Sequence, residues 1–545
     1  SGGGAGIQAD LHAIHSMQCH GCSAITCLTA QNSVGVTAVH APDPSFLEQQ
    51  LDTLMDDLPP QAIKIGMLGT RSLAQLVGEK LKTIKEQASS RVWIVLDPVM
   101  ISTSGSKLLE DDAVDAMIEY IFPLADIVTP NKFEAEALLK RKLQTTDDIE
   151  NAAQDLLQMG CFAVLIKGGH TLIESSSTED SGEPTAEVLS TLKYAQDYLL
   201  TAETPPLESD ERLCDACRGV WLRTPRWDSD NTHGTGCTLS SAIASALALG
   251  EHERTKTQHP VGATSSIQIV DACCLAKAYV SAGIQRGVQL GKGPGPVAQT
   301  EFPSSFENFP SIPIDPTTES HGFRPMSAYG SGKDNQADIP VLGRILPIVD
   351  TVDWVERLAK TSGVNDIQLR IKDETDPDRI VERAIQCQRI CQEAGVRLWI
   401  NDHWEAALKA GCFGVHVGQE DLVRCMKAGG IDKLREANVA FGISTHSYGE
   451  LAAALAIQPS YISLGPIFST SSKKVQFDPQ GLEIAARWRK LIPPTIPFVT
   501  IGGISDVEIA KQNRQAGADC IAVIGAVTQA TNVPDIVSKL NDAMQ

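Results

Sequence analysis

The chain has 545 residues, 42% of them hydrophobic, which is enough material for about two to four domains with buried cores. Its formal net charge of −21 and pI near 5.0 argue against general nucleic-acid binding, because phosphate backbones are held by clustered Lys and Arg. No apolar run approaches the roughly 18–20 residues of a membrane-spanning helix, so we expect a soluble protein that acts on small molecules.

The chain opens inside a glycine turn, SGGGAGIQADL, with no start Met and no targeting sequence. We expect a targeting segment or a first strand to be missing here, so this end does not distinguish the cytoplasm from a plastid or another organelle. The chain has fourteen cysteines, and two pairs of them have CxxC spacing, Cys19/Cys22 and Cys214/Cys217. Further zinc ligands are not evident near either pair. We predict that the cysteines are reduced and mostly buried, in an intracellular enzyme. A metal or redox role is the alternative for the two CxxC pairs.

Four short apolar runs alternate with amphipathic stretches in the first 170 residues: AIKIGML, VWIVLDPV, ADIVTPN and FAVLIKGG. Strands joined by helical crossovers predict a mostly parallel sheet with helices on its faces. Ligands of such sheets bind beyond the carboxyl ends of the strands, where polar residues follow each run here. The polar residues 171–220 are predicted to be an irregular surface insertion.

The stretch NTHGTGCTLS precedes an alanine-rich helical run and places Gly234, Gly236 and Cys237 at a helix entry. Backbone N–H groups of such a turn, together with the helix N-terminus, suit a phosphate or its transition state. The same N-terminus is expected to lower the pKa of Cys237 and make its thiolate a base. An ordinary helix-entry turn with a thiol that merely packs is the alternative.

Four further polar residues follow the predicted strands. Asn131 and Glu134 can orient hydrated Mg²⁺, and Asp97 and Lys167 can handle metal and nucleotide phosphates. Taken singly, each can also be a helix cap or a solvated charge. Together they indicate phosphoryl transfer, which depends on positioning and on charge neutralisation.

Residues 300–340 are rich in Pro, Ser, Gly and acidic side chains and predict an extended linker between domains at 1–299 and 341–545. Eight strand-like runs follow it: ILPIVD, IQLRIK, RLWIND, GVHVG, VAFGIST, YISLGPIF, FVTIGG and CIAVIG. Helix-compatible segments separate these runs. Eight strand–helix units in about 200 residues predict a compact (β/α)8 barrel whose site lies at the carboxyl ends of the strands.

Charged and hydroxyl side chains gather at those strand ends. Gln368, Arg370 and Lys372 alternate along one strand and suit a diphosphate. Asp402 and Asp421 are expected to bind Mg²⁺, with helix N-capping as the alternative for Asp421. The segment GPIFSTSSKK contributes hydroxyl groups and a cation. The glycines of IGGIS and AVIGAV are typical of a phosphate-binding site formed after the seventh and eighth strands of a barrel. Two phosphorylated groups and a metal are therefore predicted to bind here.

The motifs GGGAGIQADL, CSAITCLTAQNSVGV, KIGML, LDPVM, TPNKFEAEAL, KGGH and NTHGTGCTLSSAIASALALG resemble hydroxymethylpyrimidine and hydroxymethylpyrimidine-phosphate kinases of the ribokinase-like fold, across most of residues 1–292. The resemblance implies an α/β sandwich in which Cys237 is the catalytic base and Gly234–Gly236 form the anion hole. It further implies that Gln31 hydrogen-bonds an aminopyrimidine, that Asp10 and Met67 line its pocket, and that Asn131 and Glu134 organise Mg-ATP.

The motifs QLRIKD, ND, GVHVGQEDL, GIST, GPIFSTSSKK and IGGI resemble thiamine-phosphate synthases across about residues 343–545. The resemblance assigns Mg²⁺ binding to Asp402 and Asp421. The residues it assigns to the pyrimidine diphosphate are Gln368, Arg370, Lys372, Asn401, Ser444 and Lys473, the last two also in catalysis. The residues it assigns to the thiazole phosphate are Thr470, Ser471, Ser472, Gly503, Ile524 and Gly525.

The combined prediction is a bifunctional enzyme of thiamine biosynthesis that uses ATP and Mg²⁺. Its substrates would be hydroxymethylpyrimidine, ATP and hydroxyethylthiazole phosphate, and no nucleic acid or membrane is expected to bind. One alternative is an active barrel whose kinase half has become a binding or scaffolding module. Another is a pyridoxal-type or sugar kinase fused to an unrelated barrel. A homo-oligomer is compatible with this prediction.

Overall fold

The protein is described by a computed structural model that covers residues 2–100, 109–168, 193–202, 219–257, 265–317, 321–329, 339–469 and 479–545; the side chains of residues 111, 253–257 and 265–267 are not described. Contacts divide the described residues into two compact units, one that ends at residue 317 and one that begins at residue 321. Within these described ranges, no helix has the length and apolar character needed to cross a membrane.

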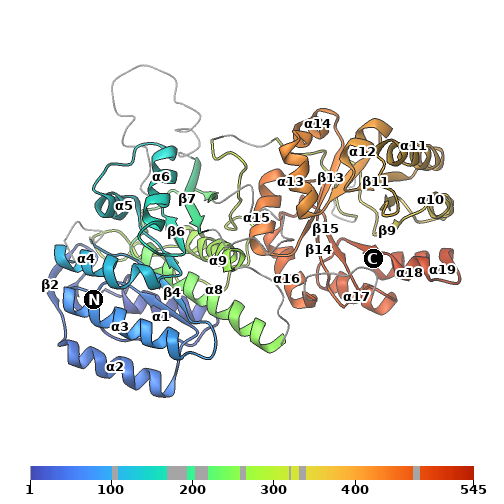
Figure 1. Cartoon of the computed structure of the whole chain (residues 1–545). Helices are drawn as coiled ribbons and strands as arrows, with labels where there is room; N and C mark the ends of the chain where they lie inside the picture. Colours follow the sequence, from blue (N-terminus) through green and yellow to red (C-terminus); the bar gives the residue numbers. More distant parts are fainter. Residues whose placement is uncertain are drawn as a thin grey trace. The chain divides into compact units, whose positions relative to one another are not determined.

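The described part of the first unit is built on a six-stranded sheet of order β3-β4-β5-β6-β7-β8 (Figure 1). Strands β3 to β6 are parallel, and β7 and β8 are antiparallel to their neighbours. The strands of this sheet are β3 (Ala62–Ile65), β4 (Trp93–Leu96), β5 (Ile127–Val128), β6 (Ala163–Ile166), β7 (Tyr194–Thr201) and β8 (Gly219–Pro225). A separate antiparallel pair is formed by β1 (Leu28–Gln31) and β2 (Val36–His40).

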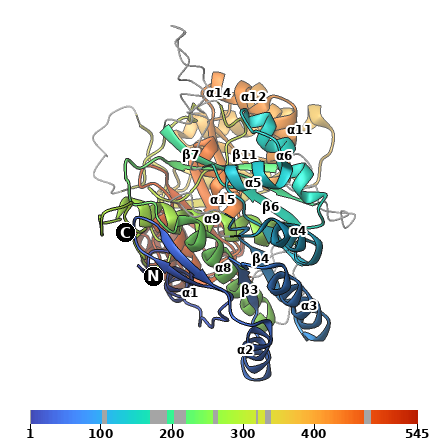
Figure 2. The ribbon, with the colours of Figure 1, turned by 90° about the vertical axis from the view of Figure 1, so that its left-hand side faces the viewer.

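Helices cover both faces of this sheet, as the predicted α/β sandwich requires. Helix α8 contacts β3 and β4 and packs against α1 and α9, whereas α3 and α4 lie on the opposite side of these strands (Figure 2). The helical elements of the unit are α1 (Ile7–Ser16), α2 (Pro44–Asp57), α3 (Arg71–Gln87), α4 (Asp111–Tyr120), η1 (Phe122–Leu124), α5 (Lys132–Leu139), α6 (Thr146–Leu157), α8 (Thr235–Thr257) and α9 (Ser265–Gln285).

The prediction of an irregular insertion at 171–220 is wrong for residues Tyr194–Thr201, which form the buried strand β7. Asp197 lies in the middle of this strand and hides its apolar pattern. Its carboxylate accepts hydrogen bonds from Lys277 Nζ at 2.7 Å and from the Gly168 N–H at 2.9 Å. A buried charge paired in this way is compatible with a strand interior, although it looks like a surface residue in the sequence.

The second unit confirms the predicted (β/α)8 barrel, because its eight strands close in the order β10-β11-β12-β13-β14-β15-β16-β9 and are all parallel. The eight predicted apolar runs correspond to these strands one by one. The strands are β9 (Ile345–Val349), β10 (Asp366–Leu369), β11 (Arg397–Asn401), β12 (Gly414–Val417), β13 (Ala440–Thr445), β14 (Tyr461–Leu464), β15 (Phe498–Ile501) and β16 (Cys520–Val523).

Helices connect the barrel strands, and several begin at side chains that accept a backbone N–H, such as Thr351, Asp376 and Ser447. The helices are α10 (Val352–Ala359), α11 (Pro377–Ala394), α12 (Trp404–Ala410), α13 (Gln419–Lys427), α14 (Gly430–Glu436), α15 (Tyr448–Ile457), α16 (Gly481–Leu491), α17 (Val507–Gln515), α18 (Gly525–Thr528) and α19 (Val533–Ala543).

Residues 300–317 and 321–329 hold no helix and no strand beyond isolated bridges, but each stretch is packed against its own unit. In the first unit, Asn308 and Phe309 are buried, and Ser281 Oγ donates to Asn308 Oδ1 at 2.9 Å. In the second unit, the ring of Phe323 stacks on that of Phe441 with centroids 4.4 Å apart. Both stretches are therefore anchored to the domains they adjoin.

Candidate active sites

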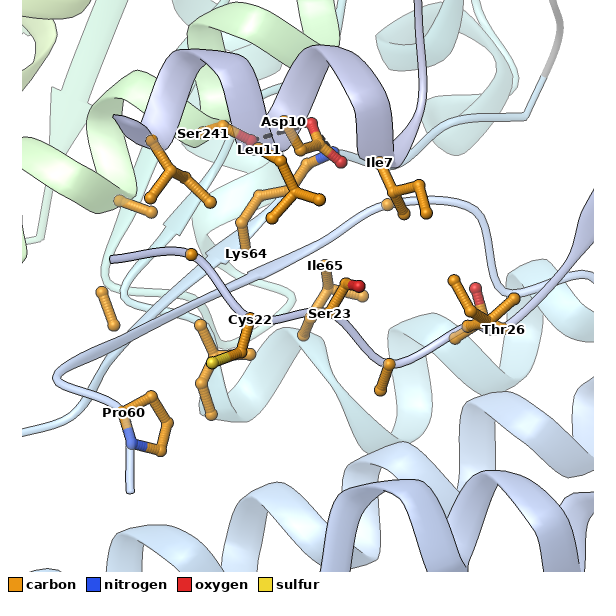
Figure 3. A pocket seen from close by; sticks show the side chains of 18 of the residues that line it. Ile7, Asp10, Leu11, Cys22, Ser23, Thr26, Pro60, Lys64, Ile65 and Ser241 are labelled. Carbon is orange, nitrogen blue, oxygen red and sulfur yellow. Dashed lines mark hydrogen bonds and ion pairs between the residues drawn. The ribbon is translucent and has the colours of Figure 1, made fainter. Parts of the chain in front are cut away.

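A cavity of about 900 Å³ opens in the first unit beside β3 and the start of α8. Four residues predicted to bind the pyrimidine or to act as base line it: Asp10, Gln31, Met67 and Cys237. In Figure 3, Asp10, Ser241 and Lys64 lie together at one part of the cavity, and Cys22 and Pro60 lie farther along it. The structure thus brings together residues that are more than 200 positions apart in the sequence.

Lys64 is a cavity residue that the sequence analysis did not single out. It lies in β3, its side chain is 8% exposed, and its Nζ donates to the two carboxylate oxygens of Asp10 at 3.0 and 3.1 Å. Ser241 Oγ from α8 also donates to Asp10, at 2.8 Å. The available signal was a lysine inside an otherwise apolar strand run, AIKIGML, where an unpaired cation would be costly to bury.

The turn before α8 requires glycine. Gly234 has φ of +82°, and a Cβ at this position would lie 1.7 Å from the carbonyl oxygen of Gly4. A Cβ at Gly236 would lie 3.2 Å from Lys167 Nζ, so the bare backbone of the turn faces a cation. Backbone N–H groups, a helix N-terminus and this ammonium together form a site suited to a phosphate group.

Cys237 lies in the first turn of α8 and accepts a hydrogen bond from the Gly6 N–H. Its pKa is raised, which contradicts the expected lowering by the helix N-terminus. Burial raises the pKa of the thiol most, and the carboxylates of Asp10 and Asp97 add to the rise, while Lys64 and the Gly6 N–H oppose it. At neutral pH the thiol is therefore mostly protonated.

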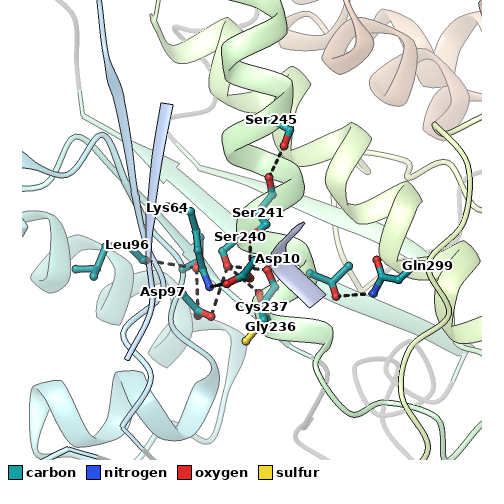
Figure 4. A network of polar contacts seen from close by, with 12 residues as sticks. Asp10, Lys64, Leu96, Asp97, Gly236, Cys237, Ser240, Ser241, Ser245 and Gln299 are labelled. Atoms are coloured by element: carbon teal, nitrogen blue, oxygen red, sulfur yellow. Dashed lines mark hydrogen bonds and ion pairs between the residues drawn. The ribbon is translucent and has the colours of Figure 1, made fainter. Parts of the chain in front are cut away.

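The four residues predicted to handle ATP and metal form a connected cluster at the ends of β4, β5 and β6. Of these four, Asp97 is labelled in Figure 4. Lys167 Nζ lies 2.8 Å from Asp97 Oδ1 and 3.8 Å from Glu134 Oε2. Asp97 and Glu134 are only 1% and 5% exposed, so neither is the solvated charge considered as an alternative. Burial raises the pKa of Glu134 to about 7, with Lys167 lowering it and Asp97 raising it further.

Asn131 and Glu134 also cap α5, as the alternative interpretation held. Asn131 Oδ1 accepts from the Glu134 N–H at 2.9 Å, and Glu134 Oε2 accepts from the Asn131 N–H at 2.7 Å, which makes a capping box. This cap fixes the Glu134 carboxylate next to Lys167. The capping role and the predicted role toward Mg-ATP are therefore compatible.

The second unit has a smaller cavity, about 140 Å³, at the carboxyl ends of the barrel strands. Predicted site residues that line it are Gln368, Arg370, Asn401, Ser444 and Ile524. Lys372 is exposed and does not line this cavity, because β10 ends at Leu369 and the alternation of side chains stops there. The predicted residues Thr470, Ser471, Ser472 and Lys473 lie outside the described part of the chain.

Asp402 and Asp421 come together as predicted, one after β11 and the other in the first turn of α13. Burial raises the pKa of Asp402 to about 7, and the neighbouring Asp421 carboxylate adds to the rise, opposed by the Gly418 N–H and Arg370. Gly418 is the N-cap of α13, so Asp421 is not the capping residue. Asp421 Oδ1 also lies 3.3 Å from a guanidinium nitrogen of Arg424, and Asp402 Oδ1 accepts from the Gly418 N–H at 3.5 Å.

A hydrogen-bonded chain across β12, β13 and β14 was not predicted. His416 Nε2 lies 2.8 Å from Ser444 Oγ, and His416 Nδ1 lies 2.8 Å from Tyr461 Oη. Both His416 and Tyr461 line the cavity. His416, Ser444 and Tyr461 lie on three successive strands of the barrel, β12, β13 and β14, so only the folded barrel brings their polar atoms together.

The predicted thiazole-phosphate residues that are described lie at the ends of β15 and β16. Gly503 has φ of +69°, and a Cβ there would lie 2.5 Å from Phe468 Cβ. Ile524 and Gly525 stand at the start of α18. Of the three, Ile524 lines the cavity, and Gly503 and Gly525 are half-buried.

The described residues contain no group of three or more His, Cys, Asp or Glu side chains arranged to hold a metal. Cys19 and Cys22 are free thiols, and Cys214 and Cys217 lie outside the described ranges.

Comparison with known proteins assigns each half. Residues 1–298 match the family model described as phosphomethylpyrimidine kinase, and residues 340–527 match that of thiamine monophosphate synthase. The probable thiamine biosynthetic bifunctional enzyme, chloroplastic, of Oryza sativa subsp. japonica is 30% identical over 544 residues, which cover 99% of this chain and 85% of that protein. The chain belongs to the bifunctional thiamine biosynthetic enzymes.

Other relatives agree with this assignment. The thiamine biosynthetic bifunctional enzyme TH1, chloroplastic, of Arabidopsis thaliana is 30% identical over 557 residues, covering 100% of this chain and 91% of that protein. The hydroxymethylpyrimidine/phosphomethylpyrimidine kinase of Synechococcus elongatus is 34% identical over 297 residues, covering 54% of this chain and 92% of that protein. This bifunctional enzyme therefore joins a kinase domain to a synthase domain, as the motifs predicted.

Proposed function

We propose that the kinase domain phosphorylates 4-amino-5-hydroxymethyl-2-methylpyrimidine and then its monophosphate from ATP. The synthase domain then couples the resulting diphosphate with hydroxyethylthiazole phosphate, giving thiamine phosphate and pyrophosphate. The observation that carries the proposal for the kinase is the position of Cys237: a thiol at a glycine turn, between the Asp10–Lys64 pair and the Asp97–Lys167 pair.

The kinase residues divide into two groups with distinct roles. Asp10 and Gln31 line the cavity and offer the carboxylate and amide that an aminopyrimidine can hydrogen-bond. Gly234 and Gly236 present backbone N–H groups to the transferring phosphoryl group, and Lys167 adds positive charge there. Cys237 accepts the proton of the hydroxymethyl group as the oxygen attacks phosphorus.

Both acidic sites fit Mg²⁺, which binds through one or two carboxylates together with phosphate oxygens. Asp402 and Asp421 would hold it in the synthase, and Glu134 and Asp97 would hold it in the kinase. The pKa values of Asp402 and Glu134 are raised mainly by burial, and a second carboxylate beside each one, Asp421 or Asp97, adds to the rise. When bound, Mg²⁺ would neutralise charge on the phosphates.

In the synthase, Arg370 would hold the diphosphate and Gln368 the pyrimidine, both from the end of β10. Gln368 Nε2 donates to Asn401 Oδ1 at 3.3 Å, which orients both amides in the cavity. Ser444, held by His416, faces the same space. Departure of pyrophosphate would leave positive charge at the pyrimidine methylene, which the thiazole nitrogen attacks.

The test supplies the pyrimidine alcohol, ATP, Mg²⁺ and thiazole phosphate to the whole chain and measures thiamine phosphate and pyrophosphate. Parallel reactions start from the pyrimidine diphosphate without ATP. We expect Cys237→Ala to lower the rate from the alcohol by about 10²- to 10⁴-fold and to leave the rate from the diphosphate unchanged. Asp402→Asn should block both routes, with Asp432→Asn on the surface of α14 as control.

Two results would contradict the proposal. Product from the diphosphate but none from the alcohol in the wild-type chain would make the kinase half a scaffold. Near-normal pyrophosphate release by Asp402→Asn would remove the acidic pair from the synthase mechanism.

A further inference from the structure

The two phosphorylations proposed for the kinase make different chemical demands on one site, and this inference rests on that proposed function. The first acceptor is a neutral alcohol, whose proton must be removed. The second acceptor is a phosphate monoester, whose second pKa is near 6, so it is already a dianion at neutral pH. The second transfer therefore needs no base, but it needs positive charge to bring two phosphates together.

Cys237 meets only the first demand. Burial raises the pKa of its thiol most, Lys64 lowers it and the carboxylates of Asp10 and Asp97 raise it further, and in neither protonation state does the group carry a positive charge. Such a thiol can take a proton from an alcohol, but it offers no attraction to a dianion. A cation must act where the acceptor phosphate would sit, on the pyrimidine side of the turn.

Lys64 is the described lysine placed for this role. It lines the cavity from β3, close to Asp10 and Cys237 (Figure 4). Burial lowers its pKa, but Cys237 and the carboxylates of Asp10 and Asp97 outweigh this effect and raise it, so Lys64 remains an ammonium. An ammonium group has three N–H donors, of which the Asp10 carboxylate takes two. A Cβ at Gly66 would lie 3.1 Å from Nζ, so this glycine leaves space beside the ammonium.

Two other described lysines near the cavity, Lys167 and Lys80, form ion pairs with carboxylates other than Asp10. Lys167 is bound by Asp97 and Glu134 and faces Gly236, on the side of the transferring phosphoryl group. Lys80 lines the cavity from α3, but its Nζ lies 2.9 Å from Glu48 and 2.7 Å from Asp52, both on α2.

We propose that Lys64 binds the phosphate of the pyrimidine monophosphate and so determines the second phosphorylation, whereas Cys237 serves only the first. In the first transfer, the hydroxymethyl oxygen forms a bond to the γ-phosphorus of ATP and its proton passes to the Cys237 thiolate. In the second transfer, an oxygen of the monophosphate forms that bond and no proton is removed. In both, the bond from the γ-phosphorus to the β–γ bridging oxygen breaks, and ADP leaves with the electron pair.

The experiment measures both phosphorylations separately in the whole chain, with the alcohol or the synthetic monophosphate as acceptor and ADP formation as readout. Lys64→Gln removes the charge but keeps an N–H donor for Asp10. We expect this variant to lose about 100-fold in kcat/KM for the monophosphate, the effect of one charge-assisted hydrogen bond, and at least ten times less for the alcohol. Cys237→Ser should show the reverse preference.

Two control variants distinguish the effect of losing the Lys64 charge from a structural effect of the substitution. Lys64→Arg keeps the positive charge and should retain most of the activity on the monophosphate. Lys80→Gln removes another carboxylate-paired lysine of the same cavity and should change neither reaction by more than about twofold. Titration calorimetry without ATP should show at least tenfold weaker binding of the monophosphate to Lys64→Gln than to wild type.

Equal losses on both acceptors in Lys64→Gln, or a larger loss on the alcohol, would overturn the proposal and make Lys64 a structural partner of Asp10. If Lys64→Gln fails to fold, the same comparison with Lys64→Met and with Lys64→Arg decides. A wild-type chain that phosphorylates neither compound would refute the proposed function instead, and the calorimetric titration would still judge phosphate binding at Lys64.

Discussion

At the scale of single residues, two opposing effects act on the thiol of Cys237. The helix N-terminus, the Gly6 N–H and Lys64 favour the thiolate, whereas burial and the carboxylates of Asp10 and Asp97 favour the thiol. Burial and the carboxylates prevail, so the pKa lies above its usual value. The Cys237 thiolate is consequently a strong base, but only a small fraction of the thiol is deprotonated at neutral pH.

The first phosphorylation is therefore expected to accelerate with pH well beyond neutrality. Below the raised pKa of Cys237 only a small fraction is thiolate, and this fraction grows about tenfold per pH unit until the pKa is reached. We expect kcat/KM for the alcohol to rise through pH 9, measured as ADP formation at constant ionic strength. A plateau below pH 8 would show that the base is another group, and Cys237→Ser should remove the rise.

Lys64 shows what residue-level prediction could not reach. Cys237 and the glycines beside it were identified because their motif is contiguous in the sequence. The partner of Lys64 is Asp10, which lies 54 positions away on another element, and the cavity joins them only in the folded chain. For the same reason, His416 and Tyr461 were missed, since their hydrogen bond spans 45 positions of a closed barrel.

At the scale of elements, the turn into α8 leaves no room for a side chain at Gly234. Gly234 combines a positive φ with a close approach to the Gly4 carbonyl, so the turn holds two glycine segments of the chain together. Any side chain here would separate them and displace the N–H groups that we propose to bind the phosphate.

Gly234→Ala is expected to lower kinase activity by at least about 100-fold, since the loss of an anion-hole donor alone has that effect. Gly250→Ala, in the same helix but with open space around its Cβ position, is the matched control and should stabilise the kinase domain by about 0.5–1 kcal/mol. Both variants are assayed for each activity and for thermal unfolding. Normal kinase activity in Gly234→Ala would contradict the assigned anion hole, and synthase activity should persist in both.

Among the other elements, apolar runs predicted β3 to β6 and the whole barrel, because a buried parallel strand is apolar on both faces. Strand β7 escaped prediction because it carries Asp197, whose partner Lys277 lies on α9. The position of Lys372 differs from prediction for a related reason: alternation of side chains holds only while the strand lasts, and β10 ends at Leu369.

At the scale of the whole molecule, a net charge of −21 is combined with sites for highly anionic substrates. Two described lysines that we propose to serve the kinase site are each held by a carboxylate: Lys64 by Asp10, and Lys167 by Asp97. Screening at physiological ionic strength limits the repulsion from distant acidic residues to about 8 Å, so the local arrangement decides binding. Each unit has its own such arrangement and its own core.

This independence predicts that the two units work without a continuous chain between them. A protease site inserted between Thr318 and Glu319 allows the whole folded protein to be cut at the boundary of the two units. Because residues up to 317 are anchored to the first unit and residues from 321 to the second, we expect the cut protein to keep both activities within about twofold. An uncut protein with the same insertion is the control. Formation of thiamine phosphate from the alcohol is then measured against dilution: the cut and uncut proteins should respond alike if the intermediates diffuse through solution, and a loss of either separate activity on cutting would show that one unit requires the other.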